Sequence, residues 1–228
     1  MNSYSDNESN WSSIADLMTG LMVVFMFILV SYILKYTEYK MVENEIYNQL
    51  EDTFNKEIDA NIVKISPDGS VRFNPDGSRV LFKYGKESIS RGFRKDLDAF
   101  IPKYLKILTN KEYFDNIKEI RIEGHTDHTY GGEGDAYEFN LNLSTKRAEE
   151  VLKYVRNHQS FKSLPDKVRK KLEFHFTANG MSYSKEINSS DSLIFFATDK
   201  RPDLNKSRRV EFRVITSNEK MIEKISSK

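Results

Sequence analysis

A single carboxylate stands inside the most apolar stretch of the chain. Residues 14–33 read IADLMTGLMVVFMFILVSYI, and Asp16 is the one charged side chain among them. Ser12, Ser13 and Thr19 lie three or four residues from Asp16, so in a helix these polar side chains share one face. An ionisable group in a membrane helix is costly unless it faces a partner or water, which makes a functional role the default interpretation. The alternative is that Asp16 only marks the end of the helix at the membrane interface.

The apolar run is long enough to cross a bilayer. Its uncharged part, residues 17–34, is eighteen residues long, which at a rise of 1.5 Å per residue covers about 27 Å of the roughly 30 Å hydrocarbon layer. A cleaved signal peptide would need a basic start and a small-residue cleavage site, but the first ten residues contain Asp6 and Glu8 and no Lys or Arg. We therefore expect a tail over residues 1–13 and an uncleaved transmembrane helix over residues 14–35.

The rest of the chain predicts a helical stalk and an α/β domain. Residues 36–60 lack Pro and Gly and carry apolar stripes at helical spacing, so the stalk needs a partner, either a second copy or the following domain. Strands are expected at residues 62–65, 71–73, 80–82, 117–123, 172–177 and 209–215, and helices at 90–108, 144–158 and 165–171. This alternation predicts a βαβαβ layer over residues 61–217, followed by a tail over 218–228.

Composition argues against several classes of function. The chain has 35 Lys and Arg against 34 Asp and Glu and no Cys, so it offers no general electrostatic attraction for nucleic acid and no thiolate metal site. No Ser-His-Asp order or phosphate-cradling glycine loop is present, and we expect no enzyme activity. His125 and His128 flank Asp127, but no further clustered ligand completes a metal site, so none is expected.

Residues 11–27, WSSIADLMTGLMVVFMF, resemble the transmembrane signature of MotB-type stator proteins. In that family the aspartate binds and releases the transported ion, so the resemblance implies this role for Asp16, with Thr19 beside the ion path. It also implies H⁺ or Na⁺ as the transported ion and no cofactor. The implied partner is a multi-helix MotA/ZorA-like membrane subunit, as a pentameric ring around a homodimer of this chain.

The domain resembles the OmpA-like peptidoglycan-binding domain in several motifs that follow one another in the family's order. These are VLFKYG at 80–85, IEGHTD at 122–127, NLNLSTKRAEEV at 140–151, Gly180 and RRVEF at 208–212. The family grips the diaminopimelate of the cell-wall peptide with an aspartate and an arginine, which by motif position are Asp127 and Arg147. Asn140 and Arg208 are further candidates for the same pocket.

The chemistry of these residue types suits that ligand. Diaminopimelate presents an ammonium and a carboxylate together, which a carboxylate acceptor beside a bidentate guanidinium can read. Because Ser144 is the expected helix cap, Arg147 is expected in the first helical turn, where backbone N–H groups also favour an anion. The alternative is an Asp127–Arg147 ion pair that only holds the loop on the helix.

Three segments depart from the family pattern. The loop over residues 128–139 is long and acidic, Lys206-Ser207 replaces the usual asparagine before the arginine pair, and residues 181–203 look like an insertion. These departures bear on affinity for the cell wall more than on the fold.

The short acidic start and the form of the apolar helix look more like the ZorB branch of the family, from the Zorya anti-phage systems, than like flagellar MotB. The resemblance implies a bacterial inner-membrane protein with its amino terminus in the cytoplasm and its domain in the periplasm. Lys35 and Lys40 follow the helix, and the positive-inside rule alone would favour the opposite orientation. A flagellar stator subunit, a passive cell-wall anchor and a signalling protein are the alternatives.

Overall fold

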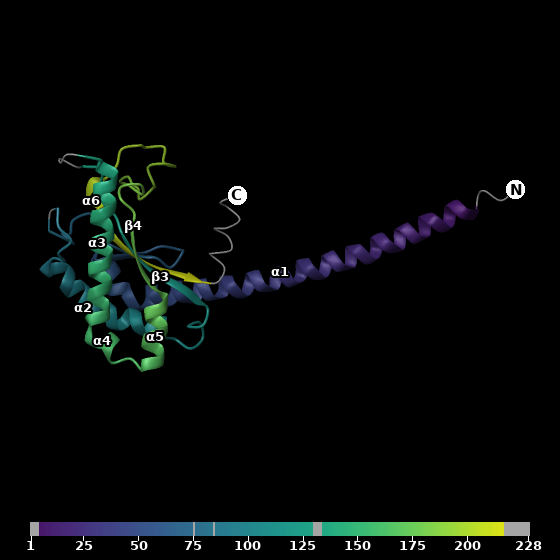
Figure 1. Ribbon diagram of the computed structural model, residues 1–228, viewed down its shortest axis with the longest axis horizontal. Helices are drawn as coiled ribbons and strands as arrows, with labels where there is room; N and C mark the ends of the chain where they lie inside the picture. Colours follow the sequence, from purple (N-terminus) through teal and green to yellow (C-terminus); the bar gives the residue numbers. More distant parts are fainter. Residues whose placement is uncertain (1–4, 75, 84, 130–133, 217–228) are drawn as a thin grey trace. The chain divides into compact units, whose positions relative to one another are not determined.

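The structure is a computed structural model that describes residues 5–74, 76–83, 85–129 and 134–216. The chain divides into two compact units, one ending at Met41 and one beginning at Val42. Helix α1 (Ser5–Asp59) contributes to both (Figure 1). In the part of the chain that is described, α1 is the one helix long and apolar enough to cross a membrane.

The second unit is built on a mixed five-stranded sheet with the order β1-β2-β5-β3-β4. The strands are β1 (Val63–Ile65), β2 (Val71–Phe73), β3 (Ile117–Gly124), β4 (Phe176–Gly180) and β5 (Val210–Thr216). The pair β3–β4 is parallel and the other pairs are antiparallel. A parallel pair needs a helical crossover, and this one contains α3 (Ala136–Asn157). The expected α/β class is confirmed.

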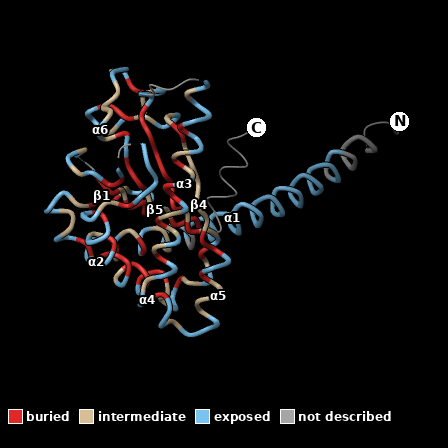
Figure 2. Tube along the Cα trace, turned by 60° about the vertical axis from the view of Figure 1, so that its left-hand side comes forward, coloured by how far each residue is buried: buried red, intermediate tan, exposed pale blue. Residues whose placement is uncertain are grey.

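Apolar side chains from the strands and helices form one core. The helices besides α1 and α3 are α2 (Arg91–Leu108), α4 (Gln159–Lys162), α5 (Asp166–His175) and α6 (Leu204–Ser207). Phe100 of α2 packs against Phe73 and Phe212 of the sheet, with ring centroids 5.0 and 5.1 Å apart. Figure 2 shows the buried residues concentrated on the strands and on the helix faces that meet them. The opposite face of the sheet is polar, with Arg72, Glu211 and Glu123 on it.

The carboxyl-terminal part of α1 belongs to this core. Ile46, Leu50 and Phe54 are buried, and the Phe54 ring lies 4.9 Å from that of Phe100. In the single chain the apolar stripe of the stalk therefore packs on the following domain. For this reason the compact unit begins at Val42 and not near residue 61.

Helix α3 begins two turns earlier than the sequence predicts. Asp135 is its N-cap, and the Asp135 side chain accepts hydrogen bonds from Tyr137 N and Glu138 N. The expected cap at Ser144 is wrong, because nothing between 136 and 143 breaks the helix and Asp135 satisfies its first N–H groups. Ser144 is instead buried mid-helix, where its Oγ donates to Leu141 O and accepts from Ser182 N, each at 3.0 Å.

Two expected strands also differ. Residues 80–82 form no strand and make only an isolated bridge between Phe82 and Ile89. Residues 172–175 continue helix α5, because Leu172 and His175 are buried one helical turn apart, and β4 begins only at Phe176.

Candidate functional site

The loop after β3 carries Asp127 and is held in place by backbone hydrogen bonds. His125 N donates to Arg209 O and Thr126 N donates to Ser182 O, each at 3.0 Å. The loop is therefore bonded to two segments that each lie more than fifty residues later in the chain. Asp127 is 4% exposed, so its carboxylate needs charged or hydrogen-bonding partners inside the protein.

The ion-pair partner of Asp127 is Arg208. Asp127 Oδ2 lies 2.5 Å from Arg208 Nη1, and Oδ1 accepts from Thr129 N at 2.8 Å and from the Thr129 hydroxyl. The alternative considered from the sequence, an Asp127–Arg147 ion pair, is not the pair that forms. The structure thus brings together Asp127 and Arg208, which the sequence separates by 81 positions.

Arg147 lies nearby in the middle of α3. Its Nε donates to Lys86 O at 3.1 Å, and its guanidinium carbon lies 4.9 Å from the Phe82 ring centroid. Burial lowers the pKa of Arg147 to about 10, the charge of Asp127 opposes this effect, and the charge of Arg208 adds to it. Because α3 begins at Ala136, the expected position in a first helical turn is wrong. An anion here would meet the guanidinium and not free helical N–H groups.

A cavity of about 320 Å³ opens beside these residues. Residues 77–82 form one wall, and Arg147, Arg208 and His125 contribute to the others. The Arg147 guanidinium, which lies against the Phe82 ring, and the Arg208 guanidinium can bind a carboxylate. Asp127 is not among the lining residues, but it is paired with Arg208, and its carboxylate can bind an ammonium. The sequence missed residues 77–79 as part of this site, because no chemical motif marks a wall made by loop packing.

Asn140 is not part of the cavity lining. It is buried in α3, and its Nδ2 donates to Ala136 O at 2.9 Å. The structure therefore gives this side chain a bond within its own helix and does not bring it to Arg147 and Arg208.

Asp16 and Thr19 lie on the first unit, one helical turn apart on α1. Thr19 Oγ1 donates to Ala15 O at 2.8 Å. Both residues are exposed in the single chain, as are the apolar residues around them. The side chain of Ser12, predicted on the same face, lies outside the described residues.

Among the described residues, one group of side chains could hold a metal ion, and it is not the set of His125, Asp127 and His128 considered from the sequence. The ligand atoms of Glu123, His125 and Glu211 lie within 4.8 Å of one another. Arg209 Nε lies 2.6 Å and Arg72 Nε 3.1 Å from Glu211 Oε1. These guanidiniums already balance the carboxylate charge, which leaves less electrostatic attraction for a cation. His128, by contrast, bonds Glu186 through Nδ1 at 2.7 Å.

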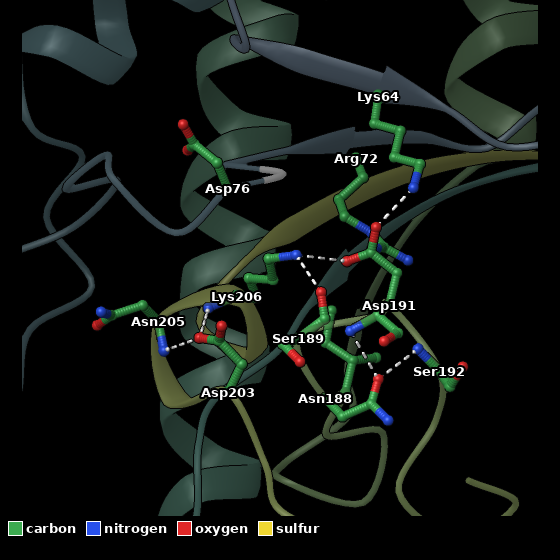
Figure 3. A network of polar contacts seen from close by, with 12 residues as sticks. Lys64, Arg72, Asp76, Asn188, Ser189, Asp191, Ser192, Asp203, Asn205 and Lys206 are labelled. Carbon is green, nitrogen blue, oxygen red and sulfur yellow. Dashed lines mark hydrogen bonds and ion pairs between the residues drawn. The ribbon is translucent and has the colours of Figure 1, made fainter. Parts of the chain in front are cut away.

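Residues 181–203, the expected insertion, are attached to the sheet by charges (Figure 3). Asp191 lies 2.5 Å from Lys64 Nζ and 3.3 Å from both Arg72 Nη1 and Lys206 Nζ. Burial raises the pKa of Asp191, but these cations outweigh that effect and lower it. The attachment continues through Lys206 into α6, the element that precedes Arg208.

Residues 81–192 match the model of the OmpA family. Fold and site together thus define an OmpA-family domain preceded by one apolar helix. The Zorya protein ZorB of Escherichia coli (strain Crooks) is 37% identical over 239 residues, which cover 96% of this chain and 93% of that protein. ZorB of Escherichia coli O139:H28 is 26% identical over 216 residues, 90% of this chain and 79% of that protein. The chain belongs to the ZorB family of Zorya proteins.

A crystal structure of a MotB-like protein from Desulfovibrio vulgaris has the same fold. It superimposes with a TM-score of 0.51 at 17% identity, over 79% of this chain and 95% of that one. The family resemblance predicted from the two sets of motifs is confirmed.

Proposed function

We propose that this chain is the peptidoglycan-anchored B subunit of an inner-membrane, proton-driven rotary motor of an anti-phage Zorya system. The observation that carries this proposal is the 37% identity to ZorB over nearly the whole of both chains, in a chain with a carboxylate, Asp16, in its apolar helix. A passive anchor has no need of that carboxylate. A flagellar stator role is the second candidate.

The membrane arrangement follows from the chemistry of one helix. Its apolar side chains are exposed along residues 17–34, and one helix cannot shield an ion path on all sides. We propose that a MotA/ZorA-like multi-helix subunit encloses a homodimer of this helix as a pentamer, with Asp16 and Thr19 facing the ion path. H⁺ is the proposed ion and Na⁺ the alternative. Each charge that crosses 100 mV supplies about 2.3 kcal/mol for movement of the ring.

The cell-wall anchor is proposed to be the cavity at Arg147 and Arg208, with the domain in the periplasm and the amino terminus in the cytoplasm. The guanidiniums would bind the diaminopimelate carboxylate and Asp127 its ammonium. Asn140 keeps only a supporting role in α3, because its amide is bonded to Ala136.

The ion-carrier role is tested by Asp16→Asn, which preserves shape and removes the titratable group. Phage protection by the complete system should be lost while membrane insertion and complex assembly remain normal. Asp59→Asn, an exposed carboxylate at the end of α1, is the matched control and should protect like the wild type. Full protection by assembled Asp16→Asn would remove the ion-carrier role.

The anchor is tested by sedimentation of the full chain, in detergent, with purified sacculi. Asp127→Asn removes the charge that would bind the ammonium, and Arg147→Lys replaces a planar guanidinium, which can bind a carboxylate through two N–H groups, with a single ammonium. Each should weaken binding about tenfold or more. Arg156→Lys, an exposed ion pair with Glu173 at 3.0 Å, should bind normally. Unchanged binding by both site variants would contradict the proposed location of the anchor.

The protection assay and the sacculus-binding assay together distinguish a motor subunit from a passive anchor. We expect Asp16→Asn to bind sacculi normally and yet fail to protect. The flagellar candidate is tested by expressing the chain with its own partner in a strain that lacks stators. Restored swimming would favour that candidate over the defence role.

A further inference from the structure

Arg208 both pairs with Asp127 and lines the cavity. Its Nη1 contacts Asp127 Oδ2 at 2.5 Å and its Nη2 bonds Asn205 Oδ1, while the residue also lines the 320 Å³ cavity. The Asp127 side chain is only 5% exposed, whereas that of Arg208 is 43% exposed. The carboxylate is therefore fixed in the protein, and the guanidinium has a path to solvent.

The backbone that carries Arg208 is held firmly. Asn74 Nδ2 donates to Asn205 O at 3.2 Å and to Arg208 O at 3.1 Å. Gly77 packs against α6 so closely that a Cβ there would collide with Asn205. Lys206 is tied to Asp191 (Figure 3). Motion at this point is consequently a swing of the Arg208 side chain and not of α6.

Arg147 offers no such freedom. The residue is 7% exposed, its Nε is bonded to Lys86 O, and its guanidinium lies against the Phe82 ring. Arg208, and not Arg147, is therefore the arginine whose side chain can move away from Asp127.

The charges then decide which ligand can displace Arg208. Asp127, Arg147 and Arg208 together carry a charge of +1, and Arg79, the third arginine that lines the cavity, is paired with Asp96 at 2.9 Å. A ligand with an ammonium alone would raise this charge to +2 beside the buried Arg147 and leave Arg208 without an anionic partner, which is electrostatically unfavourable. A ligand with both an ammonium and a carboxylate keeps the charge at +1 and offers the displaced guanidinium a new partner.

We propose that Arg208 is a specificity-determining residue that occupies the ammonium position on Asp127 until a ligand with an adjacent carboxylate exchanges with it. This inference rests on the proposed peptidoglycan binding. It gives Arg208 a role that the fixed Arg147 cannot fill: the site selects the zwitterionic end of diaminopimelate over a simple ammonium.

The test uses two peptides that differ by one carboxylate. L-Ala-γ-D-Glu-meso-diaminopimelate carries the free zwitterion, and the same peptide with L-lysine carries only the ammonium. Binding to the full chain in detergent is measured by isothermal titration calorimetry. Wild type should prefer the diaminopimelate peptide by about tenfold or more, which corresponds to about 1.4 kcal/mol.

Arg208→Gln should narrow this preference to about threefold or less, mainly because the lysine peptide binds more tightly. Arg208→Lys keeps a cation beside Asp127 and should restore the selectivity, which a purely structural role would not predict. Arg201→Gln, whose side chain is 90% exposed in the same segment, should leave both affinities unchanged. Circular dichroism of each variant verifies that the domain is folded.

The outcomes separate this inference from the function on which it rests. If wild type binds neither peptide nor sacculi, the proposed cell-wall function fails and the inference fails with it. If wild type binds selectively but Arg208→Gln keeps the same ratio, or weakens both peptides equally, only the role of Arg208 is overturned. A lysine variant that fails to restore selectivity also overturns it.

Discussion

Glu211 is the carboxylate around which the buried charges of the sheet are arranged. Burial raises the pKa of Glu211, but the charges of Arg209, His125 and Arg72 outweigh it and hold the pKa at about 2, below its ordinary value of 4.5. A lowered carboxylate pKa in the folded state stabilises the protein above the unfolded-state pKa. This contribution is fully present above pH 4.5 and is lost as the pH falls toward 2.

Glu211→Gln should therefore destabilise the domain by about 3 to 5 kcal/mol at pH 7, because it leaves Arg209 buried without its anionic partner. The loss of stability between pH 4.5 and 2 should also become shallower. Thermal unfolding of the full chain in detergent, followed by near-ultraviolet circular dichroism at several pH values, measures both effects.

The control is Glu173→Gln, which removes the partner of Arg156 from a solvent-exposed ion pair and should cost less than about 1 kcal/mol. If the two variants have the same stability at pH 7 and lose it equally between pH 4.5 and 2, Glu211 does not organise the buried charges of the sheet.

Among the elements, α1 changes its role along its length. Leu50 and Phe54 are fully buried in the domain core, while Met41, at the end of the first unit, is 63% exposed. Phe54→Ala should cost about 3 to 5 kcal/mol through the cavity it leaves, and Met41→Ala should cost little. Urea unfolding of the full chain in detergent compares the two. Equal, small costs would mean that the stalk is independent of the domain.

Helix α3 reaches its position over the sheet through a glycine contact. A Cβ at Gly124 would collide with the carbonyl oxygen of Ser144, which is backbone and cannot move aside. Gly124→Ala should destabilise the domain by about 1 to 3 kcal/mol. Gly92→Ala is the matched control, because its Cβ would have only Ser90 Oγ at 3.9 Å. A neutral Gly124→Ala would show that α3 can shift without cost.

On the scale of the whole molecule, orientation in the membrane is the property most open to test. Lys35 and Lys40 favour a cytoplasmic domain by charge, whereas the proposed ligand lies in the periplasm. Since the chain has no Cys, single substitutions report topology without background. Lys170→Cys, at an exposed position, should react with a membrane-impermeant maleimide in intact spheroplasts. Ser3→Cys should react only after permeabilisation, and the reverse pattern would contradict the proposed orientation.

Local signals in the sequence determined much of the fold. The apolar run with Asp16 needs only side-chain chemistry to be recognised. The helix expected over residues 90–108 forms as α2, and Ser90 is its N-cap, accepting from Phe93 N at 3.1 Å; such capping depends on residues three positions apart. Strand β3 forms where the sequence places Ile117, Ile120 and Ile122, and the motifs that point to Asp127 and Arg147 are short and contiguous. Each of these features is decided within one element or one turn.

The tertiary structure decided what the sequence left open. Ser144 was the predicted cap of α3, but Asp135 is the cap that forms, and Ser144 is buried with its Oγ accepting from Ser182 N. The apolar stripe of the stalk could have packed on a second copy or on the following domain, and in the single chain it packs in the domain core. Asp127 pairs with Arg208, which follows α6, and not with Arg147, whose Nε is bonded to Lys86 O. Pairings between residues far apart in sequence depend on how elements pack, which no local pattern encodes.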